Sequence, residues 1–363
     1  MIFIQFHQTV TNHDAIGNDI EIIHRILSAK HDSYVYADNQ FNKKVNYIEK
    51  EELESLIAKK DTVILYHHSG YWKEGYDILK KAKCRIIFRY HNITPPEFFE
   101  KYNEGYFNVC MEGRKQTEIL CKEFPDAYWF CDSVYNSKDI VGVSEDRISI
   151  CAPFNKMEEW GRAVPDEDIL EALVESREKN ILFVGRVVPN KGHLMLLDII
   201  RTYISYYGPE IKLRVIGKFI EEIEGYNDIV RQKIAEYGIE DNIEFIGEIN
   251  DSTLMSYYLG SDVMLVCSEH EGFCVPVVEA QFFGLPVVAL SKCAVPETIG
   301  KNQVLLDSDV YRYAAAIKVI TENEKYANCL EQNGIKNYKD RFSFEKISEC
   351  FTKELHRMIG VEL

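Results

Sequence analysis

The stretch DVMLVCSEHEGFCVPVVEAQFFGLPVVAL, residues 262–290, carries the clearest fold signal in the chain. It opens with an apolar run of the length of a buried strand and passes through a turn that contains Gly272. A short apolar segment then runs from Pro276 to Gly284, and a second strand-like run covers 287–290. Strand, helix and strand in this order predict a βαβ unit, in which a helix joins two parallel strands.

The same alternation covers almost all of the 363 residues. The first series of expected strands covers 2–6, 33–36, 63–66, 85–90, 127–131 and 148–151. The second series covers 181–184, 213–216, 243–246, 263–267, 287–290 and 304–306. Helical segments such as 19–28, 51–58, 193–206 and 221–237 separate these strands. The pattern therefore predicts an α/β protein with parallel sheets.

The segment 152–179 divides the two series. It contains Pro153, Pro165 and many charges but no strand signal, so we expect a linker and the entry helix of a second domain. The expected domains are 1–160 and 165–341, each Rossmann-like. Because ligands bind beyond the carboxyl ends of such strands, the two parallel sheets are expected to face a central cleft.

Composition excludes several classes of function. A net charge of −16 disfavours nucleic acid as a partner, since phosphate backbones are bound by basic surfaces. No run of about 18 apolar residues predicts a membrane span. The ten cysteines lack CxxC spacing, and the N-terminus has no signal-peptide pattern, so we expect reduced thiols, a cytoplasmic protein and no metal site.

A basic run lies in the first half of the chain. It consists of Lys80, Lys81, Lys83, Arg85 and Arg89. A solvated helix end is the favoured interpretation. The alternatives are peripheral contact with an anionic membrane surface, on its inner face, and contact with an acidic acceptor.

Two carboxylates, Glu271 and Glu279, frame the turn in the opening stretch. On one straight helix they would lie about 12 Å apart along the axis, which is too far for an acid/base pair at one bond. A turn that leads into a helix instead gathers backbone N–H groups and the positive end of the helix dipole. This arrangement is typical of a site for anions or sugar hydroxyls.

A second signal lies at 181–192, where an expected strand ends at Gly185 and a helix is expected to begin near Asn190. Arg186 and Lys191 stand in the loop between them. A guanidinium can grip phosphate oxygens with two hydrogen bonds, and an ammonium supplies a point charge. Two cations beside a helix N-terminus therefore predict a diphosphate site, although an ordinary solvated loop would look similar.

In this order, Gly-Arg…Lys-Gly at 185–192 and Glu-Gly-Phe…Pro…Glu-Ala at 271–280 resemble two motifs of one enzyme family. They are similar to the phosphate loop and the Glu-x7-Glu signature of the retaining, nucleotide-sugar-dependent glycosyltransferases of the GT-B fold, family 4 type (glycosyl transferases group 1). The resemblance is specific between 181 and 297. It implies a C-terminal donor domain and a final helix, 342–363, that packs back on the N-terminal, acceptor-side domain.

The resemblance also implies roles for residues of the second half. Arg186 and Lys191 would hold the nucleotide diphosphate, and Glu279 would accept hydrogen bonds from ribose hydroxyls. Glu271 would contact the transferred sugar, and the backbone at Ile246 would meet the base. Backbone N–H groups at Gly272, Phe273 and Cys274 would meet phosphate or sugar.

In the first half, His91 follows an expected strand and resembles the cleft histidine of the family. It would suit a contact with a sugar hydroxyl or a role in the transition state, although a lone histidine is more often structural. The pair His67 and His68 is a weaker candidate of the same kind. Gly17 follows the first strand and would let the backbone approach a ligand, although many relatives carry two glycines here.

The resemblance implies that the protein functions as a retaining, metal-independent glycosyltransferase without a cofactor. It would move a sugar from a nucleoside diphosphate to a hydroxyl of a glycan, lipid-linked or glycoconjugate acceptor in polysaccharide synthesis, with GDP-mannose mildly favoured. The alternative is a non-catalytic homologue that binds nucleotide-sugar and acts as a regulatory or scaffold subunit. A nucleotide-sugar epimerase or a phosphorylase of the same fold has no recognisable residue set here. The sequence leaves the acceptor and the oligomeric state open.

Overall fold

The computed structural model describes residues 1–12 and 14–362. The chain divides into two compact units. Unit 1 comprises Met1–Pro96, Asn108–Lys156 and Phe344–Leu363. Unit 2 comprises Glu97–Phe107 and Met157–Ser343.

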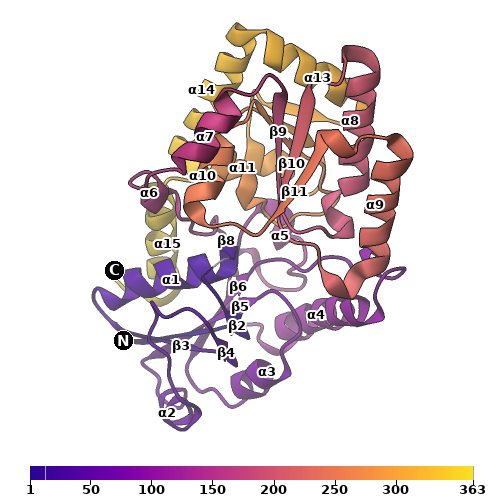
Figure 1. The fold of residues 1–363 in the computed structure, drawn as a ribbon. Coiled ribbons are helices and arrows are strands. Elements are labelled where there is room, and N and C mark those ends of the chain that lie inside the picture. Colours follow the sequence, from indigo (N-terminus) through magenta and orange to yellow (C-terminus); the bar gives the residue numbers. More distant parts are fainter. Residues whose placement is uncertain (13, 363) are drawn as a thin grey trace. The chain divides into compact units, whose positions relative to one another are not determined.

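Unit 1 is built on a six-stranded parallel sheet in the order β3-β1-β5-β6-β7-β8 (Figure 1). The strands are β1 Ile2–Phe6, β3 Asp32–Tyr36, β5 Thr62–His68, β6 Arg85–Tyr90, β7 Tyr128–Cys131 and β8 Ile148–Ile150. The strand order reverses between β1 and β5, which pair directly. In open α/β sheets this reversal opens a crevice at the carboxyl ends of the two strands, where ligands bind.

Helices cover both faces of this sheet. On one face, α1 (Ala15–Ser28) and α15 (Phe344–Ile359) bury apolar side chains against the strands, among them Ile23 and Phe351. On the other face, α2 (Lys50–Leu56), α3 (Lys73–Leu79) and the last turns of α4 (Glu104–Glu123) do the same. The remaining short elements are β2 Thr9–Val10, β4 Asn39–Gln40, α5 Val134–Ser137 and the 3-10 turns η1 Pro96–Phe98 and η2 Glu145–Arg147. The sheet is therefore buried on both sides, as a parallel sheet requires.

Unit 2 contains a second six-stranded parallel sheet, in the order β11-β10-β9-β12-β13-β14 (Figure 1). The strands are β9 Lys179–Val184, β10 Ile211–Ile216, β11 Ile243–Gly247, β12 Val263–Val266, β13 Val287–Leu290 and β14 Val304–Leu306. This is the doubly wound order of dinucleotide-binding folds, and its reversal point lies between β9 and β12.

The helices of unit 2 connect these strands and pack in pairs, α8 with α13 and α11 with α14 among them. Their bounds are α6 Met157–Trp160, α7 Glu167–Val174, α8 His193–Tyr207, α9 Glu224–Tyr237, α10 Asp251–Gly260, α11 Val275–Phe282, α12 Val295–Ile299, α13 Val310–Glu322 and α14 Glu324–Arg341. Short 3-10 turns occur at η3 Pro189–Lys191, η4 Glu221–Ile223 and η5 Glu240–Asn242.

The predicted fold class is confirmed: the chain is an α/β protein with two parallel sheets. Every predicted strand occurs, and the two-residue strands β2 and β4 are additional. The helix expected near Asn190 begins later, at His193, because Gly192 adopts a left-handed conformation with φ 74° and interrupts the turn. None of the described helices combines the length and apolar composition that crossing a bilayer would need.

Candidate functional site

In unit 2, two loops leave the carboxyl ends of the neighbouring strands β9 and β12. The first loop carries Arg186 and Lys191, and the second leads through Glu271 to α11. The reversal of strand order between β9 and β12 places the residues predicted for the diphosphate and for the sugar at one edge of one sheet.

Two hydrogen bonds hold the two loops together. The backbone N–H of Glu269 donates to the carbonyl of Asn190 across 2.8 Å, and the side-chain amide of Asn190 donates to the carbonyl of His270 at 3.3 Å. Gly192 lies so close to β12 that a Cβ there would stand 2.1 Å from the carbonyl oxygen of Cys267. Only glycine fits at this position, because it combines that approach with a positive φ.

This backbone contact brings Lys191 to Glu271. The Nζ of Lys191 donates to Oε1 of Glu271 across 2.6 Å, with side-chain exposures of 19% and 11%. Burial is the largest single cause and disfavours the charged ammonium, but the attraction and the hydrogen bond of Glu271, together with the effect of Cys274, outweigh it, and the pKa of Lys191 is raised. Lys191 therefore stays a cation at the edge of the sheet.

Arg186 lies exposed in the same loop. Its side chain has no hydrogen-bond or ion-pair partner within the described residues, although its charge acts on Lys191. An exposed guanidinium that no carboxylate neutralises, beside a partly buried ammonium, makes this edge attractive to an anion.

The start of α11 forms the next part of the site. Cys274 precedes the helix with φ 78°, and Pro276 stands in the first turn. The carbonyl of Phe273 accepts a hydrogen bond of 2.5 Å from the Thr298 hydroxyl, which anchors the turn that begins at Gly272. Burial raises the pKa of the Cys274 thiol well above its usual range, so this group remains a neutral thiol.

Glu279 lies inside α11 and Glu271 before it, so the turn separates the two carboxylates as the sequence predicted. Glu279 accepts a hydrogen bond of 2.6 Å from the hydroxyl of Tyr258. Ile246 is half-buried in β11, next to Gly247, whose carbonyl accepts from the N–H of Gly217 at 2.9 Å. The structure thus places all the predicted donor residues in unit 2, and their roles remain predictions.

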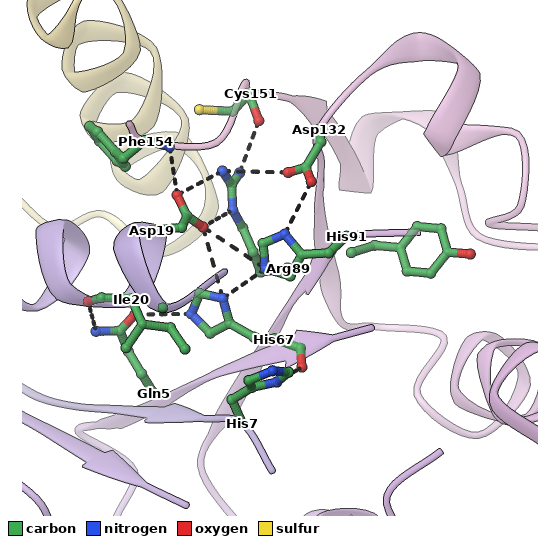
Figure 2. A network of polar contacts seen from close by, with 12 residues as sticks. Gln5, His7, Asp19, Ile20, His67, Arg89, His91, Asp132, Cys151 and Phe154 are labelled. Atoms are coloured by element: carbon green, nitrogen blue, oxygen red, sulfur yellow. Dashed lines mark hydrogen bonds and ion pairs between the residues drawn. The ribbon is translucent and has the colours of Figure 1, made fainter. Parts of the chain in front are cut away.

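In unit 1, His91 follows β6 and lies in a buried polar network (Figure 2). Its Nδ1 lies 3.0 Å from Oδ2 of Asp132, and its Nε2 lies 2.9 Å from Nδ1 of His67. The rings of His67 and His91 stack with centroids 5.2 Å apart. Protein groups therefore occupy both ring nitrogens of His91, and a direct contact of this ring with a sugar would require one of these contacts to open.

The hydrogen bonds of this network determine its proton count. The Gln5 amide donates to the carbonyl of Ile20, so its oxygen must accept from Nε2 of His67, at 2.9 Å. The contact between the two imidazoles needs one proton, and so does the contact with Asp132. The three contacts from Gln5 to Asp132 therefore need three protons. Two neutral imidazoles bring only one proton each, so the network holds one proton more than they supply.

Arg89 supplies the remaining charge of the network. It is fully buried and forms two hydrogen bonds with Asp19, at 2.8 and 3.2 Å, while Asp132 lies 3.5 Å away. Burial disfavours its charge, but the two carboxylates outweigh burial and raise the pKa of Arg89. Two carboxylates, one guanidinium and the shared proton leave the buried cluster uncharged, as a site remote from water requires.

The inclusion of Arg89 in a solvated basic run was therefore wrong. Its side chain lies in the core of unit 1, where its Nη atoms also donate to the carbonyls of Cys151 and Ala152. The sequence does not reveal this because the partner carboxylate lies 70 residues away.

Asp19, His67 and His91 also bring three ligand-type atoms within 4.8 Å of one another. The same atoms already bind protein groups, and the Arg89 cation contacts Asp19 directly. A second cation at this point would face electrostatic repulsion, so these residues fit a shared proton better than a metal ion.

Three further candidate positions lie in unit 1: His67, His68 and Gly17. His67 and His68 are buried, and His68 is hydrogen-bonded to Thr117 at 2.8 Å. The N–H of Gly17 donates to the capping carboxylate of Asp14 at 2.7 Å, and a Cβ on Gly17 would stand 2.0 Å from the carbonyl oxygen of Thr11. Packing within the chain thus accounts for Gly17, and its contact with a ligand remains a prediction.

Sequence reasoning missed His7. It follows β1, and its Nδ1 lies 3.1 Å from the carbonyl oxygen of His67. The signal that could have found it is its place directly after the first strand, at the reversal point of the sheet.

Comparison with known proteins relates part of this chain to a family. Residues 166–337 match the model of "Glycosyl transferases group 1". An uncharacterized 41.2 kDa protein in the cps region of Klebsiella pneumoniae is 27% identical over 62% of this chain and 57% of its own length. The MMP alpha-(1->4)-mannosyltransferase of Mycolicibacterium hassiacum is 27% identical over 47% of this chain and 41% of its own length. The chain thus matches about half the length of these relatives.

The fold has solved counterparts. The structure of Anabaena Alr3699/HepE in complex with UDP and glucose aligns with a TM-score of 0.78 at 14% identity, covering 97% of this chain and 98% of the other. Such low identity establishes the fold alone. The match to the glycosyl transferases group 1 family thus covers residues 166–337, which lie in unit 2, and the GT-B fold of the solved counterparts covers nearly the whole length.

Proposed function

We propose that this protein is a retaining glycosyltransferase that moves a sugar from a nucleoside diphosphate to a hydroxyl group. The observation that carries the proposal is the Lys191–Glu271 pair of 2.6 Å beside the exposed Arg186. These groups stand at the carboxyl edge of β9 and β12, where a phosphate-bearing ligand is expected in a doubly wound sheet.

Each group has a defined task in this reaction. The bond between the anomeric carbon and the diphosphate breaks, and the acceptor oxygen forms its bond to that carbon on the same face. The departing phosphate oxygen takes the proton of the acceptor hydroxyl. Arg186 and Lys191 stabilise the negative charge that develops on the diphosphate, and this electrostatic effect supplies the catalysis.

Unit 2 is proposed as the donor domain, and the residues 165–341 expected from sequence lie within it. Glu279, held by Tyr258, would accept hydrogen bonds from ribose hydroxyls. Glu271 would contact the transferred sugar while it fixes Lys191. The N–H groups at Gly272, Phe273 and Cys274 would meet phosphate or sugar, and the backbone at Ile246 would meet the base.

We favour GDP-mannose as the donor. A mannosyltransferase among the relatives supports this choice, while the complex of Anabaena HepE with UDP and glucose makes UDP-glucose the competing donor. A hydroxyl of a glycan, a lipid-linked sugar or another glycoconjugate is the proposed acceptor class.

A thermal-shift panel of UDP-, GDP- and dTDP-sugars identifies the donor, because a ligand that binds the folded state raises Tm. Product formation from the same donors, labelled in the sugar, then tests transfer. GDP-mannose should give the largest shift and a labelled product. Binding without transfer to any acceptor of the proposed class would favour the scaffold function instead.

The reaction needs no metal ion in this proposal, because Arg186 and Lys191 supply the positive charge for the diphosphate. Activity should survive EDTA. A strict requirement for Mn²⁺ or Mg²⁺ would contradict this part of the proposal.

A further inference from the structure

A small cavity lies in unit 1 at the carboxyl ends of β1 and β5. Its volume is about 40 Å³, and its lining includes His7, Gln8, Tyr66, Ser69, Gly70 and Trp72. A cavity needs about 10–15 Å³ to hold one water molecule, so this one has room for a hydroxyl group and the carbon that bears it.

The cavity lies at the reversal point of the strand order in this sheet. His7 and Gln8 follow β1, while Ser69 and Gly70 follow β5. Doubly wound sheets bind ligands at this point. The corresponding point of unit 2, between β9 and β12, carries Lys191 and Glu271.

The surroundings of His7 determine its tautomer. Figure 2 shows its ring against the backbone of His67, with Nδ1 3.1 Å from the carbonyl oxygen. A carbonyl only accepts, so Nδ1 carries the proton. Burial is the main cause that lowers the pKa of His7 to about 4, and the charge of His91 adds to it, against the smaller effects of the His67 carbonyl and of Asp14. The imidazole is therefore neutral near pH 7, and Nε2 presents a lone pair.

His7 differs in this respect from His91, whose two nitrogens are both engaged by protein groups. Within the described residues, no protein group hydrogen-bonds to Nε2 of His7. Of the two imidazoles, His7 is the one that can accept a hydrogen bond from a ligand without breaking an existing contact.

We propose that the cavity between the ends of β1 and β5 binds a hydroxyl or hydroxymethyl group of a sugar, which donates its hydrogen bond to Nε2 of His7. Ser69 and Gln8 supply further polar groups at its edge. The sugar belongs to the donor or to the acceptor, and this identity rests on the proposed function.

Gly70 offers a direct test. A Cβ at Gly70 would meet no protein atom within 4 Å, and its φ is not in the left-handed region, so Gly70→Ala adds a methyl group to open space without strain. Gly225 in α9 of unit 2 meets the same two conditions, and Gly225→Ala is the matched control. We expect Gly70→Ala to weaken sugar binding about tenfold, and Gly225→Ala to leave it within about twofold.

Two variants of His7 separate the role of Nε2, the proposed acceptor for the sugar, from that of Nδ1, which donates to the carbonyl of His67. His7→Asn keeps a donor near the Nδ1 position, for the carbonyl of His67, and removes the acceptor. His7→Gln returns an oxygen acceptor near the Nε2 position. We expect His7→Asn to lose about three- to tenfold in affinity and His7→Gln to recover part of this, since one net hydrogen bond is at stake.

The readout is the ¹H–¹⁵N spectrum of the histidine side chains of the full chain, with assignment of His7 by its variants. UDP-glucose, GDP-mannose and methyl α-mannoside are added separately. A shift of the His7 Nε2 resonance with a nucleotide sugar, absent in Gly70→Ala, assigns the cavity to the donor. A shift with the methyl glycoside assigns it to the acceptor.

No movement of this resonance with any of the three probes would overturn the inference. A Tm increase with a nucleotide sugar in that same case would leave the proposed transferase function standing. Conversely, a response of His7 to the methyl glycoside without any Tm increase from a nucleotide sugar would support the cavity and contradict the transferase.

Discussion

Lys191 donates a hydrogen bond of 2.6 Å to Glu271 and thereby joins the loops that follow β9 and β12. The two residues stand 80 positions apart in the chain. Each was expected at the donor site for a separate reason, one for phosphate and one for sugar. In the proposed donor site, their contact means that the carboxylate assigned to the sugar also positions the cation assigned to the diphosphate.

Lys191→Ala is expected to reduce kcat/KM about 10²- to 10³-fold, because it removes a preorganised positive charge from the developing diphosphate anion. Steady-state kinetics with the donor found by thermal shift provides the measurement. Lys336→Ala is the control, since Lys336 is a largely exposed lysine that pairs with Asp340 on α14. Full activity of the Lys191 variant would show that the donor site is assigned wrongly.

Glu279→Gln tests the proposed ribose contact. The substitution keeps the shape of the side chain but weakens the acceptor, so affinity for UDP or GDP should fall about tenfold. Affinity for inorganic pyrophosphate, which has no ribose, should not change. Calorimetry on both ligands measures the difference, and Tyr258→Phe, which removes the 2.6 Å partner of Glu279, should give a smaller loss. An equal loss for both ligands would place Glu279 at the phosphates instead.

Asp19→Asn should destabilise unit 1 by about 3–5 kcal/mol, since it leaves the buried Arg89 guanidinium without its main counter-charge. Urea denaturation followed by circular dichroism measures the loss. Asp77→Asn is the matched control, because Asp77 pairs with Lys73 and Lys80 on the exposed side of α3. The loss of stability in this control should be far smaller, because solvent screens an exposed ion pair. Similar values for the two variants would mean that Arg89 finds another partner.

Acid should lower the free energy of unfolding, because a buried histidine takes up a proton more readily in the unfolded chain than in the folded one. Burial lowers the pKa of His193 to about 3, while the same group in the unfolded chain titrates near 6.5. Between these two values only the unfolded chain binds the proton, so the free energy of unfolding falls as pH falls, by about 1.4 kcal/mol per pH unit.

His193→Phe should remove this contribution. The ring packs edge-on against Phe183 at 4.8 Å, and both its nitrogens lack a side-chain partner, so an apolar ring fits the site. Unfolding of both proteins at pH 7 and pH 5 measures the slope. An unchanged slope between the variant and the parent would show that His193 does not titrate in this window.

The alternation of apolar runs and amphipathic segments determined the fold class, because the side-chain periods of strands and helices depend on local geometry. The order of Arg186, Lys191, Glu271 and Glu279 along the chain predicts that the second unit carries the donor residues, and this stays a prediction. The helix start was predicted too early, at Asn190 rather than His193, because the close approach of Gly192 to Cys267 is not visible in a local pattern.

Only the tertiary structure showed which polar groups share one site. The strand order brought His67 beside His91, joined Arg89 to Asp19, and placed His7 at the cavity after β1. The proton count of the buried network follows from contacts between residues that lie far apart in the chain. A charged residue such as Arg89 is stable in the core only when its counter-charges are buried with it, and sequence spacing carries no record of that pairing.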